Sequence, residues 1–309
     1  KIRYLDDDKK EWNLRALNIA LKNIKEYNEE IISGKDLKDK IKGIGDKISK
    51  RIDEILENGC LKELENLNLN EDSYEELMSI VGVGKSRAKD WIKLGIRNIT
   101  DLKENIKNKN LKITKNIELG LKYYDDLKSR IPREEINEIK KIIEKIILKI
   151  NENLIFNICG SYRRGLNHSG DIDLLITHKE YDGDVNKFNF LSKIISNLKK
   201  EKFIIDDLSK GNKKFMGFCK LNDKSYARRI DLLFIDYKSY YSSILYFTGN
   251  KYFNLHIRQK LLQKKMSLNE YYLKNLVTNE IIYLKSEKEI FDILEMNYLE
   301  PFERNYQNS

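Results

Sequence analysis

The chain has 309 residues, enough for one large domain or several small ones, and its formal net charge is +9 at pH 7. That charge suits a polyanionic partner, although charge by itself does not separate nucleic acid from an anionic membrane. The sequence has no apolar run near the ~18 residues of a membrane span and no secretory signal pattern. Its cysteines, Cys60, Cys159 and Cys219, are widely spaced, which argues against a disulfide framework or a zinc site.

The N-terminal third is predicted to be helical and to contact a phosphate backbone. Apolar residues recur at helical spacing from 11 to 32, and two Gly-x-Gly turns follow, Gly43–Gly45 and Gly82–Gly84, each before an amphipathic helix. One such turn could simply join packed helices, but two copies in a basic segment favour binding of DNA phosphates through backbone N–H groups. Contacts of this kind position DNA without reading its sequence. The polar residues after the turns are Lys47, Lys85 and Ser86.

The middle of the chain predicts a helix over 136–150 and then strands that carry carboxylates. An apolar run from Leu154 to Cys159 predicts a buried strand that ends at a Gly-Ser turn. The alternation of the next strand places Asp171 and Asp173 on one face. A third strand, 226–235, carries Asp231 among apolar residues, where an isolated charge would be costly to bury.

Three neighbouring carboxylates require a cation, because they would otherwise raise one another's pKa. Hard oxygen ligands favour Mg²⁺, which completes its shell with substrate phosphates. The turn at Gly160 and Ser161 could hold a phosphate, with charge-assisted contacts from Arg163 and Arg164. An isolated Asp-x-Asp is more often a solvated strand edge, but the combined pattern predicts a two-metal site for phosphoryl transfer.

Three motifs resemble the palm of family X DNA polymerases, and the resemblance is closest to enzymes of the beta type. They are Gly160-Ser161-Tyr162-Arg163-Arg164-Gly165, Ser169-Gly170-Asp171-Ile172-Asp173 and Arg228-Arg229-Ile230-Asp231. The resemblance covers nearly the whole chain and implies an α+β fold. It implies a helical lyase-like domain (1–66), a second helix-hairpin-helix subdomain (67–130), a palm with a mixed sheet (131–237) and a small α+β nucleotide-binding subdomain (238–309).

The resemblance also implies a role for individual residues. Asp171 and Asp173 would bridge two Mg²⁺ ions, which Mn²⁺ could replace, while Asp231 would bind one ion, accept the primer proton and be oriented by Arg229. The residues implied in nucleotide binding are Arg130, Ser161, Arg164, Gly170, Tyr246, Phe247, Gly249 and Asn254. Those implied in DNA binding are Gly43, Gly45, Lys47, Gly82, Gly84, Lys85, Ser86, Lys214 and Arg258. Backbone carbonyls implied to hold a monovalent cation, Na⁺ or K⁺, are those of Ile41, Ile44, Ile80 and Val83.

The sequence departs from the family pattern at two positions. Arg51 stands where family relatives carry the lysine that forms a Schiff base with a 5′-deoxyribose phosphate, and an arginine stays protonated and cannot form an imine. Lyase activity is therefore doubtful, with Lys47 or Lys50 as a displaced nucleophile. Lys251 replaces an acidic residue over the incoming base.

The expected reaction is template-directed: a primer 3′-hydroxyl attacks a deoxynucleoside triphosphate and pyrophosphate leaves. The expected substrates are nicked DNA or short gaps with a 5′-phosphate, as in base excision repair. We expect a monomer, no membrane association, and an intracellular location at a site of DNA repair: the nucleus, or the cytoplasm or virion of a virus. The alternatives are a template-independent or RNA-directed nucleotidyltransferase and a non-catalytic binder of DNA ends.

Overall fold

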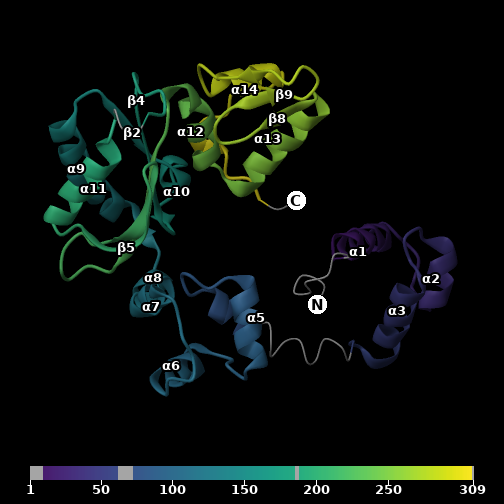
Figure 1. The fold of residues 1–309 in the computed structure, drawn as a ribbon. Coiled ribbons are helices and arrows are strands. Elements are labelled where there is room, and N and C mark those ends of the chain that lie inside the picture. The colour runs from purple at the N-terminus through teal and green to yellow at the C-terminus, as the bar shows by residue number, and fades with distance from the viewer. Residues whose placement is uncertain (1–9, 62–71, 185–187, 308–309) are drawn as a thin grey trace. The chain divides into compact units, whose positions relative to one another are not determined.

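The computed structural model describes residues 10–61, 72–184 and 188–307, and the chain divides into two compact units, Lys1–Ile113 and Thr114–Ser309 (Figure 1). In the described part of the chain, no helix is both long enough and apolar enough to cross a membrane.

The first unit begins with α1 (Lys10–Lys25), α2 (Gly34–Lys40) and α3 (Asp46–Asn58). The Ser33 side chain caps α2 by accepting a hydrogen bond from the Asp36 N–H. A Cβ on Gly34 would lie 2.0 Å from the Ser49 carbonyl oxygen, so the absence of a side chain lets α2 pack directly on α3. The buried apolar residues of this part are Ala20, Leu37, Ile41 and Ile44.

The rest of the first unit contains a helical segment over 72–78, then α5 (Lys85–Lys93) and α6 (Ile99–Lys107). Asn98 caps α6 through the Asp101 N–H. The core residues Leu77, Ala88 and Leu102 are completely buried or nearly so. Both predicted helical regions are therefore confirmed as helical, while the predicted domain boundary between 66 and 67 lies outside the described residues.

The second unit contains a five-stranded mixed sheet in the order β2-β4-β7-β6-β5. Its strands are β2 (Leu154–Ile158), β4 (Ile172–His178), β5 (Ile204–Lys210), β6 (Lys214–Cys219) and β7 (Arg228–Phe234). Strands β4 and β7 are parallel, and the other neighbours are antiparallel. The helical N-terminal part and this mixed sheet confirm the predicted α+β fold class.

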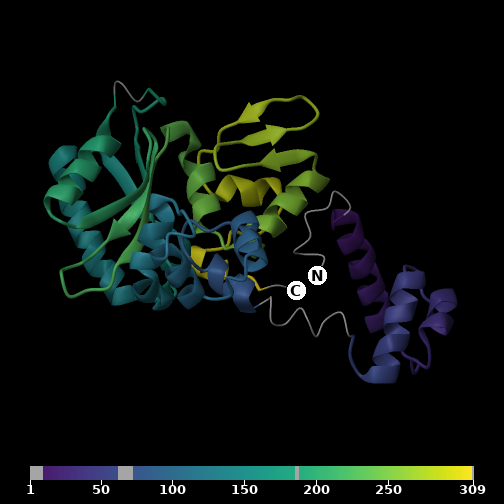
Figure 2. The same ribbon diagram turned by 60° about the horizontal axis from the view of Figure 1, so that its bottom comes forward.

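Helices α9 (Arg133–Ile150) and α11 (Phe190–Lys200) cover one face of the sheet (Figures 1 and 2). Their isoleucines and leucines pack with Ile172, Leu174, Ile230 and Leu232 from the central strands. The opposite face packs in part against α12 (Tyr240–Thr248), through Leu175 and Ile235. Because side chains alternate along a strand, residues between the core-facing ones in β4 and β7 point away from α9 and α11.

Shorter elements connect the sheet to its surroundings. They are α7 (Lys115–Lys122), α8 (Tyr124–Lys128), β1 (Ile131–Pro132), α10 (Gly160–Arg163), β3 (His168–Ser169) and η2 (Tyr237–Ser239). The Asp206 carboxylate on β5 accepts hydrogen bonds from Lys122 and from the Tyr123 hydroxyl, which holds α7 against the edge of the sheet.

The C-terminal part has its own apolar core around Phe253, Ile257 and Phe291. Its further elements are α13 (Lys251–Gln263), β8 (Met266–Leu268), β9 (Leu273–Asn275), β10 (Ile281–Ile282), α14 (Lys288–Ile293) and η3 (Pro301–Glu303). The three strands form a small antiparallel sheet in the order β10-β9-β8.

Candidate active site

The pairing of β4 with β7 brings the predicted carboxylates together. Asp173 and Asp231 are direct partners in this parallel pair, and Asp171 precedes β4 by one residue on the same face as Asp173. All three lie on the face of the sheet opposite α9 and α11, because Ile172 and Ile230 beside them point into the core. Asp231 is only 8% exposed, whereas Asp171 lies open to solvent.

These carboxylates affect one another's protonation. Burial, together with the charges of Asp171 and Asp231, raises the pKa of Asp173 from 3.8 to about 7. Although Asp171 is still exposed, its partial removal from water raises its pKa, and Asp231 adds to the shift while Arg229 and Arg130 oppose it. Asp173 is the less exposed of the two. A cation would stabilise both charged forms.

The guanidinium of Arg229 already pairs with one of the three carboxylates, that of Asp231. Its Nη2 lies 3.0 and 3.1 Å from the two carboxylate oxygens of Asp231. Within the described residues, Asp171 and Asp173 make neither an ion pair nor a hydrogen bond through their carboxylates, and no three potential ligands stand in a metal-binding arrangement. The chemistry of the three carboxylates fits divalent cations, provided that Asp231 exchanges Arg229 for a metal ion.

A cavity of about 740 Å³ opens beside Asp171 and Asp173, and residues of both the palm and the C-terminal part line it. Eleven of the predicted site residues line it: Arg130, Ser161, Arg164, Gly170, Asp171, Asp173, Tyr246, Phe247, Gly249, Asn254 and Arg258. Such a cavity is large enough for a nucleotide, since small-molecule sites typically measure ~300–1,000 Å³. Leu166 and Leu255 also line it. Sequence reasoning missed these two, because an exposed leucine carries no pattern that would indicate a site.

The predicted phosphate loop is the short helix α10, whose first residue must be glycine. Gly160 has a φ of +59°, and a Cβ there would lie 3.3 Å from the Asp173 carboxylate. Ser161 donates from Oγ to the Ser169 hydroxyl at 2.8 Å. Arg164 donates to the Thr248 carbonyl and to the Asn305 side chain, and burial lowers its pKa. This arrangement holds the guanidinium of Arg164 at the cavity wall.

The expectation that Arg163 contacts the phosphate is wrong. Its guanidinium instead makes a bidentate ion pair with Glu287 and donates to the Thr248 hydroxyl at 2.6 Å. Arg304, which is fully buried, donates to the same Glu287 carboxylate at 2.6 Å. Burial alone would raise the pKa of Glu287, but the two arginines lower it overall. The triad therefore joins α10 to the start of α14.

The opposite wall of the cavity comes from α12 and α13. The rings of Tyr246 and Phe247 pack edge to face at 5.0 Å. Asn254 donates from Nδ2 to the Tyr246 carbonyl, and the Arg258 guanidinium lies 5.0 Å from the Tyr246 ring centre. Lys251, the departure from the family pattern, also lines the cavity.

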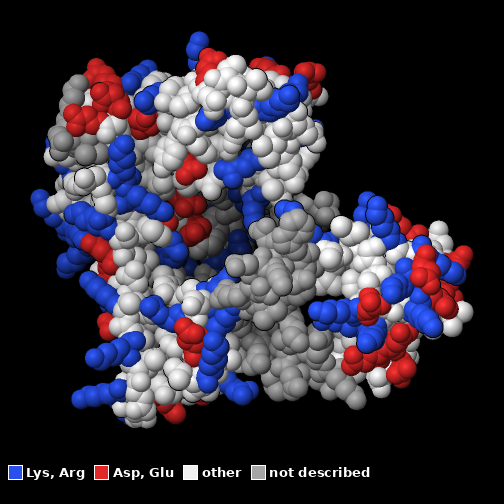
Figure 3. Space-filling model, turned by 45° about the vertical axis from the view of Figure 1, so that its right-hand side comes forward, with Lys and Arg blue, Asp and Glu red and all other residues white. Residues whose placement is uncertain are grey.

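Lys214 lies elsewhere, at a separate cavity of about 270 Å³ that Lys213, Tyr271 and Tyr272 also line. Figure 3 shows lysine and arginine side chains spread widely over the surface of both units. Lys214 does not line the nucleotide-sized cavity, but its charge opposes the rise in the pKa of Asp173, so Lys214 stays a candidate for contact with DNA near the carboxylates.

The two predicted hairpins have the same local geometry. Gly43 and Gly82 have φ values of +97° and +91°, a region that favours glycine. The carbonyls of Ile41 and Ile80 accept hydrogen bonds from the N–H groups three residues later, those of Ile44 and Val83. Gly45 and Gly84 then cap α3 and α5 with extended backbones, which leaves the first N–H groups of each helix available to an anion.

A cavity of about 520 Å³ adjoins the first hairpin. Lys47 and Arg51 line it, together with Gly43, Gly45 and Asp46, whereas Lys50 is not among its lining residues. Of the two displaced-nucleophile candidates, only Lys47 thus faces the cavity beside Arg51.

Comparison with known proteins identifies the family. Four family models match successive parts of the chain: a helix-hairpin-helix domain (2–61), the fingers domain of DNA polymerase lambda (75–128), the DNA polymerase beta palm (130–237) and the DNA polymerase beta thumb (243–305). The chain belongs to the family X DNA polymerases. The palm match contains all three carboxylates, and the thumb match contains Tyr246, Phe247, Asn254 and Arg258.

Curated relatives agree with this assignment. The chain is 30% identical to DNA polymerase lambda of Rattus norvegicus over 96% of this chain and 53% of the relative, and 29% identical to DNA polymerase lambda of Arabidopsis thaliana over 98% and 59%. It is 29% identical to DNA nucleotidylexotransferase of Xenopus laevis over 85% and 58%. The chain thus spans about half the length of the curated relatives it matches.

Proposed function

We propose that this chain is a template-directed DNA polymerase that fills short gaps during DNA repair. The observation that carries the proposal is the cavity that brings Asp171 and Asp173 of the palm together with Arg164, Tyr246 and other polar residues of two different domains. The names of the polymerase lambda relatives support it. In the reaction, the primer 3′-oxygen forms a bond to the α-phosphorus of a deoxynucleoside triphosphate, and pyrophosphate leaves.

Asp171, Asp173 and Asp231 would hold two Mg²⁺ ions, with Mn²⁺ as a substitute. When bound, the metal neutralises phosphate charge and lowers the pKa of the primer hydroxyl. Asp231 accepts the proton from that hydroxyl after its ion pair with Arg229 opens. Arg229 is then a positioning residue, because it fixes the Asp231 carboxylate until substrate is present.

The nucleotide is held by residues on both walls. Ser161, Arg164 and Gly170 bind the β- and γ-phosphates, and Arg130 lies on the same cavity. The remaining contacts follow the family pattern: Tyr246, Phe247 and Gly249 at the sugar, Asn254 at the base, and Arg258 at the template.

The hairpins bind the DNA backbone on either side of the gap, each with a monovalent cation held by the carbonyls named above. A 5′-phosphate at the gap would be bound by Lys47 and Arg51 at the 520 Å³ cavity. We propose that the protein acts on gapped or nicked DNA as a monomer.

The primary test is extension of a primer across a short gap with Mg²⁺ and single nucleotides. We expect incorporation of the nucleotide complementary to the template base, and loss of activity by roughly a thousandfold or more in Asp231→Ala. Glu152→Gln, which removes an exposed carboxylate outside the site, should retain full activity. Unchanged incorporation by Asp231→Ala would remove the catalytic assignment.

A template-independent nucleotidyltransferase is the second candidate, because the Xenopus laevis relative is named as a nucleotidylexotransferase. The same assay separates the two functions. Extension of a single-stranded primer without regard to template would favour the second candidate, and extension that changes with each template base supports the first.

A further inference from the structure

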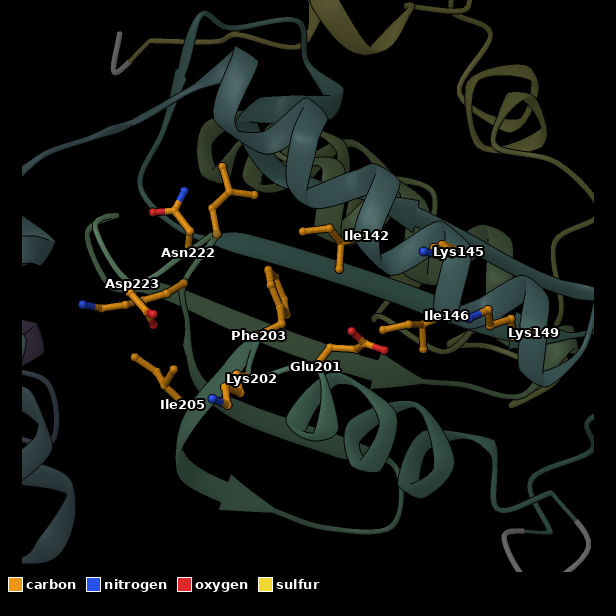
Figure 4. Close-up of a pocket in the computed structure, with 12 residues that line it drawn as sticks. Ile142, Lys145, Ile146, Lys149, Glu201, Lys202, Phe203, Ile205, Asn222 and Asp223 are labelled. Carbon is orange, nitrogen blue, oxygen red and sulfur yellow. The ribbon is translucent and has the colours of Figure 1, made fainter.

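A second cavity lies in the palm, on the side of the sheet away from the catalytic carboxylates. It has a volume of about 360 Å³ and lies between α9, the residues that follow α11, the start of β5 and the connection from β6 to β7. Figure 4 shows its lining side chains, with Phe203 near the centre between α9 and the strands. We call it the helix-side pocket. Nothing in the polymerase reaction proposed above uses it.

The floor of the helix-side pocket is apolar and reachable from solvent. Ile142, Ile205 and Leu221 are each partly exposed, while Phe203 and Ile146 beneath them are 3% and 6% exposed. The volume is enough to take an apolar side chain from a partner, since binding pockets begin near ~300 Å³. Covering three partly exposed apolar residues would be favourable by the hydrophobic effect.

The rim of the helix-side pocket is mainly basic, through Lys145, Lys149, Lys202 and Lys220. Within the described residues, none of these four lysines makes an ion pair, so their charges are available to a partner. Lys149, in the last turn of α9, also interacts favourably with the helix dipole. The helix dipole explains a lysine only at the end of α9. It explains neither the presence of Lys220, which follows strand β6, nor the apolar floor of the pocket.

Two carboxylates, Glu201 and Asp223, also stand on the rim. They would repel a continuous phosphate backbone, which presents negative charge at regular spacing and no apolar side chain. A peptide fits this mixed rim better than a phosphate backbone does. It can place acidic side chains at the lysines and its own N–H groups at the two carboxylates. Complementary charge around an apolar anchor is typical of a protein–protein contact.

We propose that the helix-side pocket docks a short acidic segment of a partner protein, with an apolar side chain of that segment inserted against Ile142, Ile205 and Leu221. Because the sheet separates this pocket from the catalytic carboxylates, the partner can stay bound during catalysis. A partner protein docked in this pocket would thus bind the polymerase without touching its DNA or its nucleotide.

The test uses the full chain and a labelled peptide in which Phe and Leu stand between Glu and Asp residues. Fluorescence anisotropy measures the affinity of the wild type and of Lys145→Glu/Lys149→Glu. The matched control, Lys140→Glu/Lys193→Glu, makes the same charge change at exposed positions of α9 and α11 outside the pocket. We expect roughly tenfold or greater loss of affinity in the first variant and little change in the control.

Two further measurements test the apolar part of the contact. A peptide with Ser in place of Phe and Leu should bind much more weakly, and the Cδ1 methyl signals of Ile142 and Ile205 should shift only with the apolar peptide. Equal affinity of both variants, equal affinity of the Ser peptide, or no binding at all would overturn the proposal. Competition by duplex DNA that is lost in Lys145→Glu/Lys149→Glu would make the pocket a DNA-binding surface instead. Primer extension by Lys145→Glu/Lys149→Glu should equal the wild type, so the result is independent of the polymerase assignment.

Discussion

Asp173 faces two other carboxylates and has no ion-pair partner in the described part of the chain, which makes the metal-free protein sensitive to pH. Its pKa is raised from 3.8 to about 7, so between these values the folded protein keeps a proton that the unfolded chain has lost. The free energy of unfolding therefore falls as pH rises from about 4 to about 7.

Asp173→Asn should remove this pH dependence. In a metal chelator, we expect the variant to have a higher midpoint of thermal unfolding than the wild type at pH 8, and a similar one below about pH 3, because Asp173 is protonated there in both the folded and the unfolded state. Mg²⁺ should stabilise the wild type more at pH 8 than at pH 6 and should have little effect on the variant. Glu152→Gln is the control for loss of a carboxylate. An unchanged pH profile in Asp173→Asn would contradict the assignment of this charge.

Arg51 lies at the position where family relatives carry a lysine that forms an imine. Because an arginine cannot form an imine, borohydride should trap no adduct of the wild type with a 5′-deoxyribose phosphate end, whereas Arg51→Lys should form one. If the wild type does form an adduct, comparison of Lys47→Ala with Lys50→Ala locates the amine. We then expect only Lys47→Ala to lose the adduct, because Lys47 lines the cavity that Arg51 also lines.

At the scale of elements, the Arg163–Glu287–Arg304 triad fixes α10 relative to α14. Glu287 is 8% exposed, and Arg304 lies about 5.4–5.5 Å from the ring centres of Phe253, Phe291 and Tyr298. Removal of one member of a buried ion pair leaves an uncompensated charge. The triad therefore holds α10, the predicted phosphate loop, in place against α14.

Glu287→Gln should lower the free energy of unfolding by about 3–5 kcal/mol, measured by urea denaturation. The control is Glu295→Gln, since Glu295 forms an exposed ion pair with Lys264 and its replacement should change the free energy of unfolding little. We also expect Glu287→Gln to raise the KM for nucleotide more than it lowers kcat, because Arg163 lies in the same short turn as Ser161 and Arg164. Equal stability of the two variants would show that the triad does not stabilise this junction.

The sequence could predict features that depend on neighbouring residues, but not contacts between distant parts of the chain. Alternation along β4 and β7 placed the three carboxylates on one face, because a period of two is a local property of a strand. The partner of Arg163 could not be predicted, since Glu287 lies 124 residues away and the pairing depends on how α10 and α14 pack. For the same reason the pairing of Lys122 and Tyr123 with Asp206, and the helix-side pocket, appear only in three dimensions.

At the scale of the whole molecule, a net charge of +9 and two separate hairpins predict binding that depends strongly on salt. Each hairpin places one lysine in the first turn of its helix, Lys47 in α3 and Lys85 in α5. Replacement of a lysine that contacts phosphate should weaken binding and reduce the slope of log affinity against log salt by about one. The first hairpin adjoins a cavity that combines a lysine with an arginine.

Lys47→Ala and Lys85→Ala should therefore respond differently to the end of the gap. With a 5′-phosphate, we expect both variants to bind gapped DNA more weakly and with a smaller salt slope than the wild type, measured by fluorescence anisotropy. With a 5′-hydroxyl, the effect of Lys47→Ala should largely disappear, because its anion is absent, while that of Lys85→Ala should persist. Lys140→Ala, an exposed lysine on α9, is the control and should leave the slope unchanged. If Lys47→Ala weakens binding equally with either end, Lys47 binds the general backbone and the 5′-phosphate is held by other groups.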